Sequence, residues 1–499
     1  MALKPEILSS FSGGINLTGQ PLNIGENDLL DCKNMYPVAA GYLVGRGGQT
    51  NYNPSAFTVD PIGSLYRFYK QNGQGITLAS AGTTLYQIND TTGIATAITS
   101  ALGGQGRRLS FVTWSSKNKV YIQNNTVAML SWDGTTLTAI GGSPIGSQVE
   151  MYLQRLYVLQ PNVVAFSDLN VDNVFQGAAL LNIADNKGGT AQFLKAANNM
   201  LIVGKTSGLW RLQGSPLLGN VFVPYSDVGC IAPLSADVVT MMSNGQVIPA
   251  GVVFLGRDGV YVTDGNTVTL ISSKITPLFT GYFKGAVGKY YPKRRQYLLS
   301  FDTAGGANDT LWVGTNIDMA GSQVAWTEYT GFNCDSFTVF DGENDSGELL
   351  AGLSVDGRIR KLDTGVQDVG VDYTCSLTTR YFGEPFKNQQ VRWIKPVFDA
   401  TKPVHYQIDY FQKQLSSGNV SSDALLGTWD VGTWDVGTWG GASFYSARTS
   451  VLDYKYGRYY STNISNTGDG ARFKFFSLAI ESRTKDRRFH DVFSLNTSP

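Results

Sequence analysis

The residues that could carry acid–base or hydrolytic chemistry are scattered along the chain. The two histidines, His405 and His490, show no HxxxH or HExxH spacing, so a histidine-based metal site is not indicated. Six aspartates could supply the paired carboxylates of a glycosidase: Asp133, Asp168, Asp258, Asp264, Asp302 and Asp356. Most of them stand beside glycine in turns, where aspartate is favoured for backbone reasons. The sequence therefore predicts no catalytic, cofactor-binding or metal-binding residue, and no enzyme.

Cysteine spacing and net charge exclude further classes of protein. The four cysteines form no CxxC pair, so neither a zinc site nor a disulfide framework is indicated: Cys32, Cys230, Cys334 and Cys375. Lys plus Arg and Asp plus Glu both number 39, which gives a formal net charge of zero. Proteins that grip nucleic acid normally show a basic excess, because their affinity arises largely from neutralised phosphates. A neutral chain still suits a wall past which DNA slides.

One compact basic cluster stands inside an otherwise strand-like region. Lys293, Arg294 and Arg295 follow Tyr290 and Tyr291 in the run YYPKRRQYLLSF. Cations beside aromatic rings could contact DNA phosphates on a channel wall, so the cluster is a candidate DNA-channel contact. The alternative is a solvated hairpin turn, because strand-like runs precede and follow the cluster.

A short tryptophan repeat is the second candidate interaction site. The unit GTWDV recurs over residues 427–441 and places Trp429, Trp434 and Trp439 at five-residue steps. Side chains of a straight strand alternate with period two, so a turn in each unit is needed to align the rings. Aligned tryptophans could anchor a neighbouring subunit or stack on a sugar ring. The alternative is a loop packed onto its own domain.

The elements that would position these residues are short β-hairpins. Residues 251–264, GVVFLGRDGVYVTD, contain two apolar runs around a Gly/Asp turn, which predicts a hairpin rather than a helix. Similar pairs recur, and one anchor residue marks each second strand: Tyr86, Leu130, Phe166, Trp210, Tyr261, Trp312 and Arg360. Their spacing of 36 to 51 residues is typical of propeller blades. We predict an all-β protein with a β-propeller of six to eight blades over residues 59–367; a β-sandwich or barrel with irregular hairpins is the alternative.

Two further regions flank the predicted propeller. Residues 1–58 carry scattered apolar anchors between glycines, which indicates an extended N-terminal arm with a short helix over residues 26–35. The arm residues that we expect to contact a subunit or partner are Phe11, Ile15, Leu22 and Leu43. Residues 368–499 contain longer, partly alternating runs, which predict a C-terminal β-sandwich-like domain.

The motifs of the arm resemble the opening of tail-associated structural proteins of bacteriophages. In that group an arm of the form F-x-GG-(I/V/L)-N … G-x-L-x-x-R-x-G precedes a β-propeller. The matching residues are Phe11, Gly13-Gly14, Ile15-Asn16, Leu22, Leu29, Asn34, Gly41, Leu43 and Arg46-Gly47-Gly48. The remainder of the chain resembles the group in predicted architecture only. The tail nozzle and packaged-DNA stabilisation proteins of short-tailed phages are the most similar group.

This resemblance implies a structural tail protein that forms a hexameric ring, extends the DNA channel, and helps to retain and then pass the genome. The implied partners are other copies, a tail adaptor, tail fibre or spike proteins, and double-stranded DNA in transit. The implied location is the virion tail, assembled in the host cytoplasm. Stable membrane insertion is not expected, because no run of about 20 apolar residues occurs. The alternatives are a carbohydrate-binding or carbohydrate-cleaving propeller of a tail fibre or spike, and a cellular propeller scaffold for peptide partners.

Overall fold

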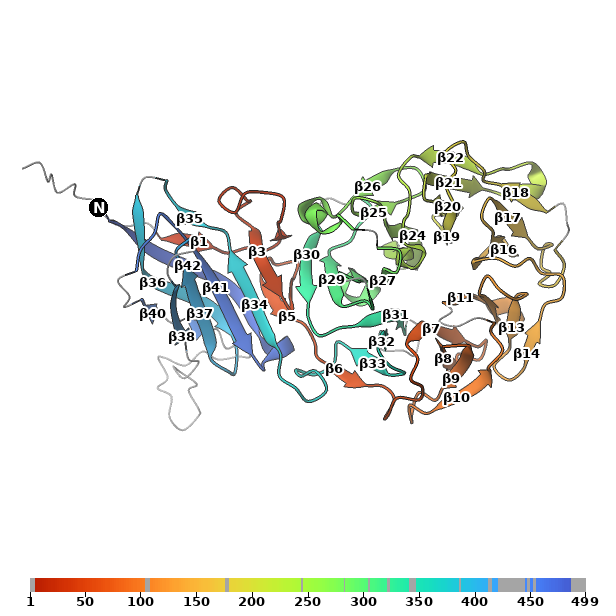
Figure 1. The fold of residues 1–499 in the computed structure, drawn as a ribbon, viewed down its shortest axis with the longest axis horizontal. Helices are drawn as coiled ribbons and strands as arrows, with labels where there is room; N and C mark the ends of the chain where they lie inside the picture. The colour runs from red at the N-terminus through yellow and green to blue at the C-terminus, as the bar shows by residue number, and fades with distance from the viewer. Residues whose placement is uncertain are drawn as a thin grey trace, which may run out of the picture. The chain divides into compact units, whose positions relative to one another are not determined.

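The computed structural model divides the chain into two compact units (Figure 1). One unit is Arg46–Val371, and the other combines Met1–Gly45 with Asp372–Pro499. The structure describes residues 5–103, 108–175, 179–243, 246–281, 283–303, 306–320, 324–340, 347–385, 387–411, 415–420, 445–446, 449–451 and 455–485. No helix in these ranges has the length and apolar character needed to cross a membrane.

The unit Arg46–Val371 is a β-propeller, in which the described residues form seven successive four-stranded antiparallel sheets. Blades 1 to 4 are β7–β10 (Ile62–Tyr69, Gly75–Ala81, Thr84–Ile88, Ala95–Thr99), β11–β14 (Ser110–Trp114, Lys119–Gln123, Leu130–Trp132, Leu137–Ala139), β15–β18 (Gln148–Tyr152, Arg155–Leu159, Val163–Phe166, Leu180–Asn182) and β19–β22 (Ala191–Ala197, Met200–Lys205, Gly208–Gln213, Val223–Ser226). Blades 5 to 7 are β23–β26 (Asp237–Ser243, Gln246–Leu255, Val260–Thr263, Val268–Leu270), β27–β30 (Val287–Tyr291, Gln296–Phe301, Thr310–Thr315, Ala325–Tyr329) and β31–β33 with β6 (Cys334–Val339, Leu349–Leu353, Ile359–Leu362, Gln49–Asn51). The helical turns are 3-10 segments: η1 (Ser115–Lys117), η2 (Pro216–Leu218), η3 (Pro233–Ser235), η4 (Ser273–Leu278), η5 (Pro292–Arg294) and η6 (Gly470–Arg472), the last of them in the other unit.

The first strand of each blade faces the propeller axis. These strands contact one another in ring order, β7, β11, β15, β19, β23, β27, β31 and back to β7. Apolar residues on both faces of each sheet are buried between neighbouring blades, as in the cluster of Phe68, Leu78 and Trp132 from blades 1 and 2. Closed radial stacking thus buries the faces that a lone four-stranded sheet would leave exposed.

The ring closes where strand β6, from before blade 1, pairs with β33 of blade 7. Beside this strand, the Arg46 guanidinium forms a bidentate ion pair with Asp368, with N–O distances of 2.9 and 2.6 Å. Arg46 is buried, also donates to the carbonyls of Gly47 and Thr330, and lies 4.4 Å from the Phe332 ring centroid. The entry and exit of the propeller chain are therefore held together by a strand pair and a buried ion pair.

The predicted propeller is confirmed, and the anchors reveal how the repeat is built. All seven lie in the third strand of their blade, on β9, β13, β17, β21, β25, β29 and β33 in chain order. The repeating hairpin of the sequence is the middle hairpin of each blade. This hairpin has neighbours on both edges and both faces, so its apolar pattern is the strongest in the repeat.

The second unit contains two sheets and is sandwich-like, as predicted. One sheet has the order β39-β36-β42-β5-β4, with β1 on β42 and β40 on β36 (Tyr445–Ser446, Asn388–Asp399, Lys474–Lys485, Leu43–Gly45, Met35–Pro37, Glu6–Leu8, Thr449–Ser450). The other has the order β3-β34-β41-β37-β38, with β2 on β3 and β35 on β41 (Asp28–Lys33, Thr374–Thr379, Tyr459–Thr467, Val404–Asp409, Leu415–Val420, Gly14–Ile15, Phe382–Gly383). Each of the long strands buries some of its apolar residues, for example Ile394 of β36, Phe475 of β42 and Ile464 of β41.

The structure divides the chain differently from the predicted boundaries at 58 and 367. Residues up to Gly45 belong with the C-terminal unit, because β1, β3 and β5 pair with β42, β34 and β42 there. The segment therefore acts as part of the sandwich instead of a separate arm. Residues 46–58 belong to the propeller and include the closing strand β6.

The predicted helix over residues 26–35 is wrong, because this segment forms strands β3 and β4. Leu29, Cys32 and Met35 are all buried and recur every three residues, which imitates a helical face. A register shift between Leu29 and Asp31 places side chains three apart on one face of β3. Asn34, with φ of 56°, then separates β3 from β4.

We expect Gly48→Ala to weaken propeller closure. A Cβ at Gly48 would lie 2.0 Å from the Gln367 carbonyl oxygen, and a backbone atom cannot rotate away as a side chain could. The overlap should lower the free energy of unfolding by about 1–3 kcal/mol, as measured by urea denaturation. Gly141→Ala is the matched control, because a Cβ there meets no atom within 4 Å. Equal stability of the two variants would contradict the closure model.

Candidate functional site

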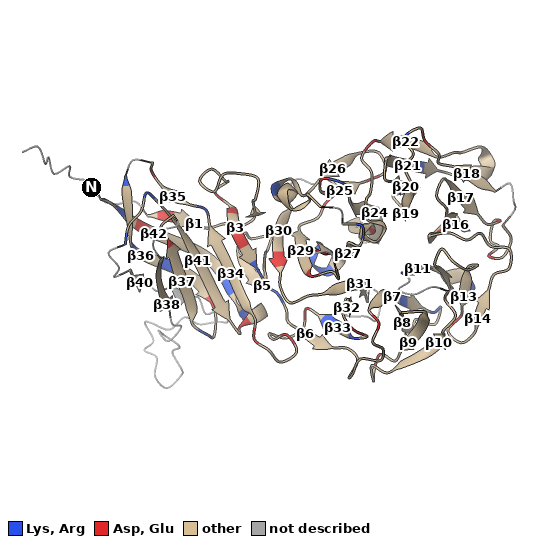
Figure 2. Ribbon diagram, in the orientation of Figure 1, with Lys and Arg blue, Asp and Glu red and all other residues tan. Residues whose placement is uncertain are grey.

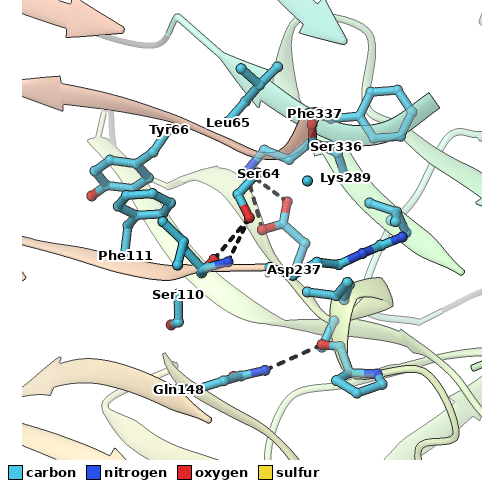
Figure 3. Close-up of a pocket in the computed structure, with 18 of the residues that line it drawn as sticks. Ser64, Leu65, Tyr66, Ser110, Phe111, Gln148, Asp237, Lys289, Ser336 and Phe337 are labelled. Atoms are coloured by element: carbon cyan, nitrogen blue, oxygen red, sulfur yellow. Dashed lines mark hydrogen bonds and ion pairs between the residues drawn. The ribbon is translucent and has the colours of Figure 1, made fainter. Parts of the chain in front are cut away.

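The candidate site is a cavity on the propeller axis, at the end where the first strands begin (Figure 3). Its volume is about 420 Å³. All seven first strands, or the loops just before them, contribute lining residues, for example Tyr66, Phe111, Gln148, Lys195, Asp237, Lys289 and Ser336. The cavity is therefore a product of ring closure, and no single blade contains it.

Side chains at the start of five of the seven first strands cap backbone groups of a following blade. Ser64 Oγ accepts from Leu109 N at 2.7 Å, and Ser110 Oγ accepts from Val149 N at 3.1 Å. The same role is filled by Gln148 on Leu194 N, by Asp237 on Tyr290 N and by Ser336 on the Ile62 carbonyl. An innermost strand has no β partner on its axial side, so these contacts satisfy groups that would otherwise be unpaired.

Three pairs of opposite charges lie at or beside the cavity. Lys289 Nζ is 3.2 Å from an Asp237 carboxylate oxygen. The Arg108 guanidinium nitrogen Nη2 is 3.4 Å from Asp335 Oδ2. Burial raises the pKa of Asp335, which the Arg108 charge opposes. Figure 3 shows Asp237 and Lys289 facing the space that Ser64 and Ser336 also border. Cations and carboxylates are thus balanced around the axis.

The third pair joins Glu150 on β15 and Lys195 on β19. Burial raises the pKa of Glu150 to about 7, and the Lys195 charge is the largest opposing influence. Backbone groups of Met151 and Ala196 also stabilise the carboxylate, while Asp237 disfavours it. Glu150 therefore changes charge near neutral pH, next to a lysine that lines the cavity.

An aromatic pair forms one wall of the cavity. The rings of Tyr66 and Phe111 are stacked, with centroids 5.0 Å apart and planes at 8°. Tyr66 Oη shares a 2.8 Å hydrogen bond with Thr113 Oγ1, which fixes the orientation of the ring. The site thus combines an apolar wall with a few charged groups, the usual composition of a small-molecule site.

The cavity offers binding groups and no visible catalytic set. The serine hydroxyls are engaged with backbone groups, and no cluster of three His, Cys, Asp or Glu occurs in the part of the chain that the structure describes. The six candidate aspartates lie apart from the lining residues. Asp133, for example, accepts hydrogen bonds from its own turn at Thr135 and Thr136, and the Thr136 amide is the main cause of its lowered pKa.

The basic cluster lies in the turn between β27 and β28, at the opposite end of β27 from the start of the strand. Arg294 forms an ion pair with Asp363, and Arg295 donates to the Ile317 carbonyl at 3.4 Å. None of Lys293, Arg294 and Arg295 lines the axial cavity. The cluster forms the hairpin turn between β27 and β28, and Arg294 also joins blade 6 to blade 7. Contact with DNA in a channel between copies stays a prediction.

The residues predicted to contact partners have different outcomes. Phe11, Ile15 and Leu43 are buried within their own unit, with the Phe11 ring 5.6 Å from Phe475, which corrects the expectation that they face a partner. Leu22 is half-buried and keeps some exposed surface. The tryptophans Trp429, Trp434 and Trp439 lie outside the described residues.

Sequence reasoning missed the charged residues of the cavity. Glu150, Lys195 and Lys289 each stand alone inside short strand-like runs, QVEMY, AQFLKAA and VGKYY. A lone charge within an otherwise apolar strand is the available signal, because such a residue needs a polar environment. Only the closed propeller shows that Lys195 and Lys289 line one cavity and that Glu150 lies close enough to Lys195 to interact with its charge.

Comparison with known proteins yields likeness of fold only. No protein-family model matches the chain, and no curated protein sequence matches it. Among solved structures it is similar to YCF48 from Cyanidioschyzon merolae, at 11% identity and a TM-score of 0.42, over 63% of this chain and 99% of that chain. It is also similar to the β-propeller domain of Myceliophteria thermophila Cps50 (Swd1), at 8% identity and a TM-score of 0.42, over the same shares. Both likenesses are remote, and the propeller assignment rests on the strand pairing described above.

We expect Glu150→Gln to remove a pH dependence of propeller stability. Because its folded pKa of about 7 exceeds the ordinary 4.5, the carboxyl binds more protons in the folded state between these values. Wild-type stability should therefore fall as the pH rises from 5 to 8, by up to roughly 3 kcal/mol at about 1.4 kcal/mol per pH unit. Urea denaturation across this range measures the slope.

The matched control for this experiment is Asp133→Asn. The pKa of Asp133 is lowered, so its stabilising contribution is complete above its ordinary value of 3.8 and is lost only in stronger acid. The slope between pH 5 and 8 should be unchanged in this variant. Parallel curves for wild type and Glu150→Gln would show that Glu150 is not the titrating group.

Proposed function

We propose that this protein is a structural component of a bacteriophage tail, in which copies form a ring that extends the DNA channel and helps to retain and then pass the genome. Tail adaptor and tail fibre or spike proteins would be its neighbours. The resemblance of the N-terminal motif series suggests this role. The observation that carries the oligomeric part of the proposal is an exposed apolar surface on the propeller.

We call this surface the apolar face. Its residues are Leu153, Leu169, Val174 and Leu180 on blade 3, Leu217, Leu218, Val221 and Val223 on blade 4, and Met242, Val247 and Ile248 on blade 5. They lie in the first-to-second and third-to-fourth connections or in the strand ends beside them. Because successive strands are antiparallel, these connections share the side of the propeller opposite the cavity mouth.

Hydrogen bonds join neighbouring blades on the side of the propeller that carries the apolar face. Tyr152 Oη of blade 3 donates to the Asn199 carbonyl of blade 4 at 2.8 Å. Asn198 N of blade 4 donates to the Pro249 carbonyl of blade 5 at 2.7 Å. The exposed apolar side chains therefore lie on the same side of three adjoining blades.

The blade 4 and blade 5 parts of the apolar face are also poor in charge. Residues 213–226 and 238–256 contain no Lys, Arg, Asp or Glu. Elsewhere on the propeller both signs of charge are interspersed (Figure 2). Depletion of charged residues together with exposed apolar side chains is typical of the centre of a protein–protein interface. A second copy of the chain is the partner that the ring proposal requires.

The size of the axial cavity bears on where DNA would run. A cavity of about 420 Å³ falls in the range of small-molecule sites and cannot enclose a DNA duplex. A channel for DNA would therefore have to be formed between several copies. The proposal thus stands or falls with oligomerisation.

The motif series that suggests the phage group also has defined structural roles. A Cβ at Gly13 would lie 2.0 Å from Asp28 Oδ1, and Asn16 Nδ2 donates to Asp28 Oδ2 at 2.7 Å. Arg46 and Gly48 belong to the propeller closure. These contacts explain why Gly13, Asn16, Arg46 and Gly48 suit their positions in this fold.

Leu218→Asp and Met242→Asp test the proposal. Leu218 is 82% and Met242 69% exposed, so an aspartate at either position should leave the fold of the monomer intact. Burying the new carboxylate in an interface would cost desolvation energy and should weaken association. Native mass spectrometry and negative-stain microscopy should show closed rings for wild type and smaller species for the variants. Val59→Asp, at 89% exposure on the cavity side, is the control and should form rings.

Two results would contradict the proposal. One is a wild-type protein that stays monomeric even when mixed with its tail adaptor. The other is ring formation that is equally strong in Leu218→Asp, Met242→Asp and Val59→Asp, which would place the interface elsewhere.

A further inference from the structure

We propose that the axial cavity of the propeller is a binding site for a neutral carbohydrate unit of one or two sugars, held by Lys195 and by the Asp237–Lys289 and Arg108–Asp335 pairs. The proposal does not depend on the oligomeric ring of the proposed function, because the cavity lies within one chain. The cavity also opens on the side of the propeller opposite the apolar face.

The size and composition of the cavity fit a small polar ligand. Its volume of about 420 Å³ lies in the range of roughly 300–1,000 Å³ that is typical of ligand sites. Residues from all seven blades line the cavity, so a ligand would be contacted all around the propeller axis, while the mouth of the cavity stays open. Such a site can remove most of a sugar from water while a few polar groups fix its orientation.

Charged side chains are prominent among the polar groups that line the cavity. Ser64, Ser110 and Gln148 already bond to backbone groups of neighbouring blades. The charged lining residues are Lys195, Asp237, Lys289, Arg108 and Asp335, of which Asp237 also accepts a hydrogen bond from Tyr290 N. Lysine and arginine only donate hydrogen bonds, and ionised carboxylates only accept them.

Charge balance favours a neutral ligand. Two of the three lining cations form ion pairs with lining carboxylates, Lys289 with Asp237 and Arg108 with Asp335. Burial raises the pKa of Glu150, and the charge of the third cation, the neighbouring Lys195, opposes this effect. An anion or a cation would have to compete with one member of a pair for the other, which costs energy in a partly desolvated site. A sugar hydroxyl both donates and accepts, so it can bond to both members of a pair at once.

The aromatic wall gives the ligand an apolar contact. Tyr66 and Phe111 are stacked and partly exposed, and both line the cavity. A pyranose ring has C–H groups on its faces and hydroxyls around its edge. One face can therefore pack against this wall while the edge hydroxyls reach the charged pairs.

Saturation-transfer NMR and calorimetry with defined probes test the proposal. The probes are glucose, galactose, N-acetylglucosamine and maltose, with glucuronate and inorganic phosphate as charged counterparts. At least one neutral sugar should bind wild type, and no charged probe should bind more tightly. Lys195→Met should weaken that binding at least tenfold, because it removes a donor while keeping a similar volume.

The matched control is Lys395→Met, an exposed lysine of the other unit, which should bind the sugar like wild type. A second measurement uses only wild type: the bound sugar should protect Lys195 from acetylation while Lys395 reacts at an unchanged rate. This arm remains valid if Lys195→Met fails to fold. Absence of binding by all four sugars, tighter binding of glucuronate or phosphate, or sugar binding without protection of Lys195 would overturn the proposal.

Discussion

Closure of a ring from one continuous chain is the constraint on which the propeller depends. Seven sheets can bury each other's faces only if the first and last are joined, and the join is made by β6 and the Arg46–Asp368 pair. Removing one partner of a buried ion pair typically costs about 3–5 kcal/mol, because the other charge is left uncompensated. The Arg46 guanidinium donates to two backbone carbonyls as well as to Asp368. These bonds connect the beginning and the end of the propeller segment at one position.

Closure also determines the chemistry of the axial cavity. Each innermost strand exposes one edge to the axis, and side chains of the preceding blade cap several of these edges. The small polar side chains are thereby used for structure. The cavity also contains a charged set, in which Asp237 of blade 5 pairs with Lys289 of blade 6 and Arg108 before blade 2 pairs with Asp335 of blade 7. The same packing that seals the ring thus makes the cavity polar and nearly neutral.

More of the fold than of the candidate site could be predicted from the sequence. The fold depends on patterns between residues close in sequence, whereas the site depends on residues far apart in sequence. Middle hairpins such as the one around Tyr261 are local and recur, so their spacing reveals the propeller. The strands at Leu29 to Met35 imitated a helix because a bulge shifts their register, and a bulge leaves no clear trace in composition. The cavity is lined by positions as distant in sequence as Ser64 and Ser336, so no local pattern could identify its members. The basic cluster at Lys293 is conspicuous in sequence, yet the turn that contains it lies away from the cavity lining.

The two sides of the propeller can serve different purposes because strand direction separates them. The cavity lies where first strands begin, and the apolar residues lie where first and third strands end. A copy that covers Leu218 and Met242 would leave the cavity mouth uncovered on the other side. Assembly and ligand binding would then be energetically independent, since neither event buries residues that the other requires. Independence of this kind would let one chain act as a structural subunit and still present a binding site.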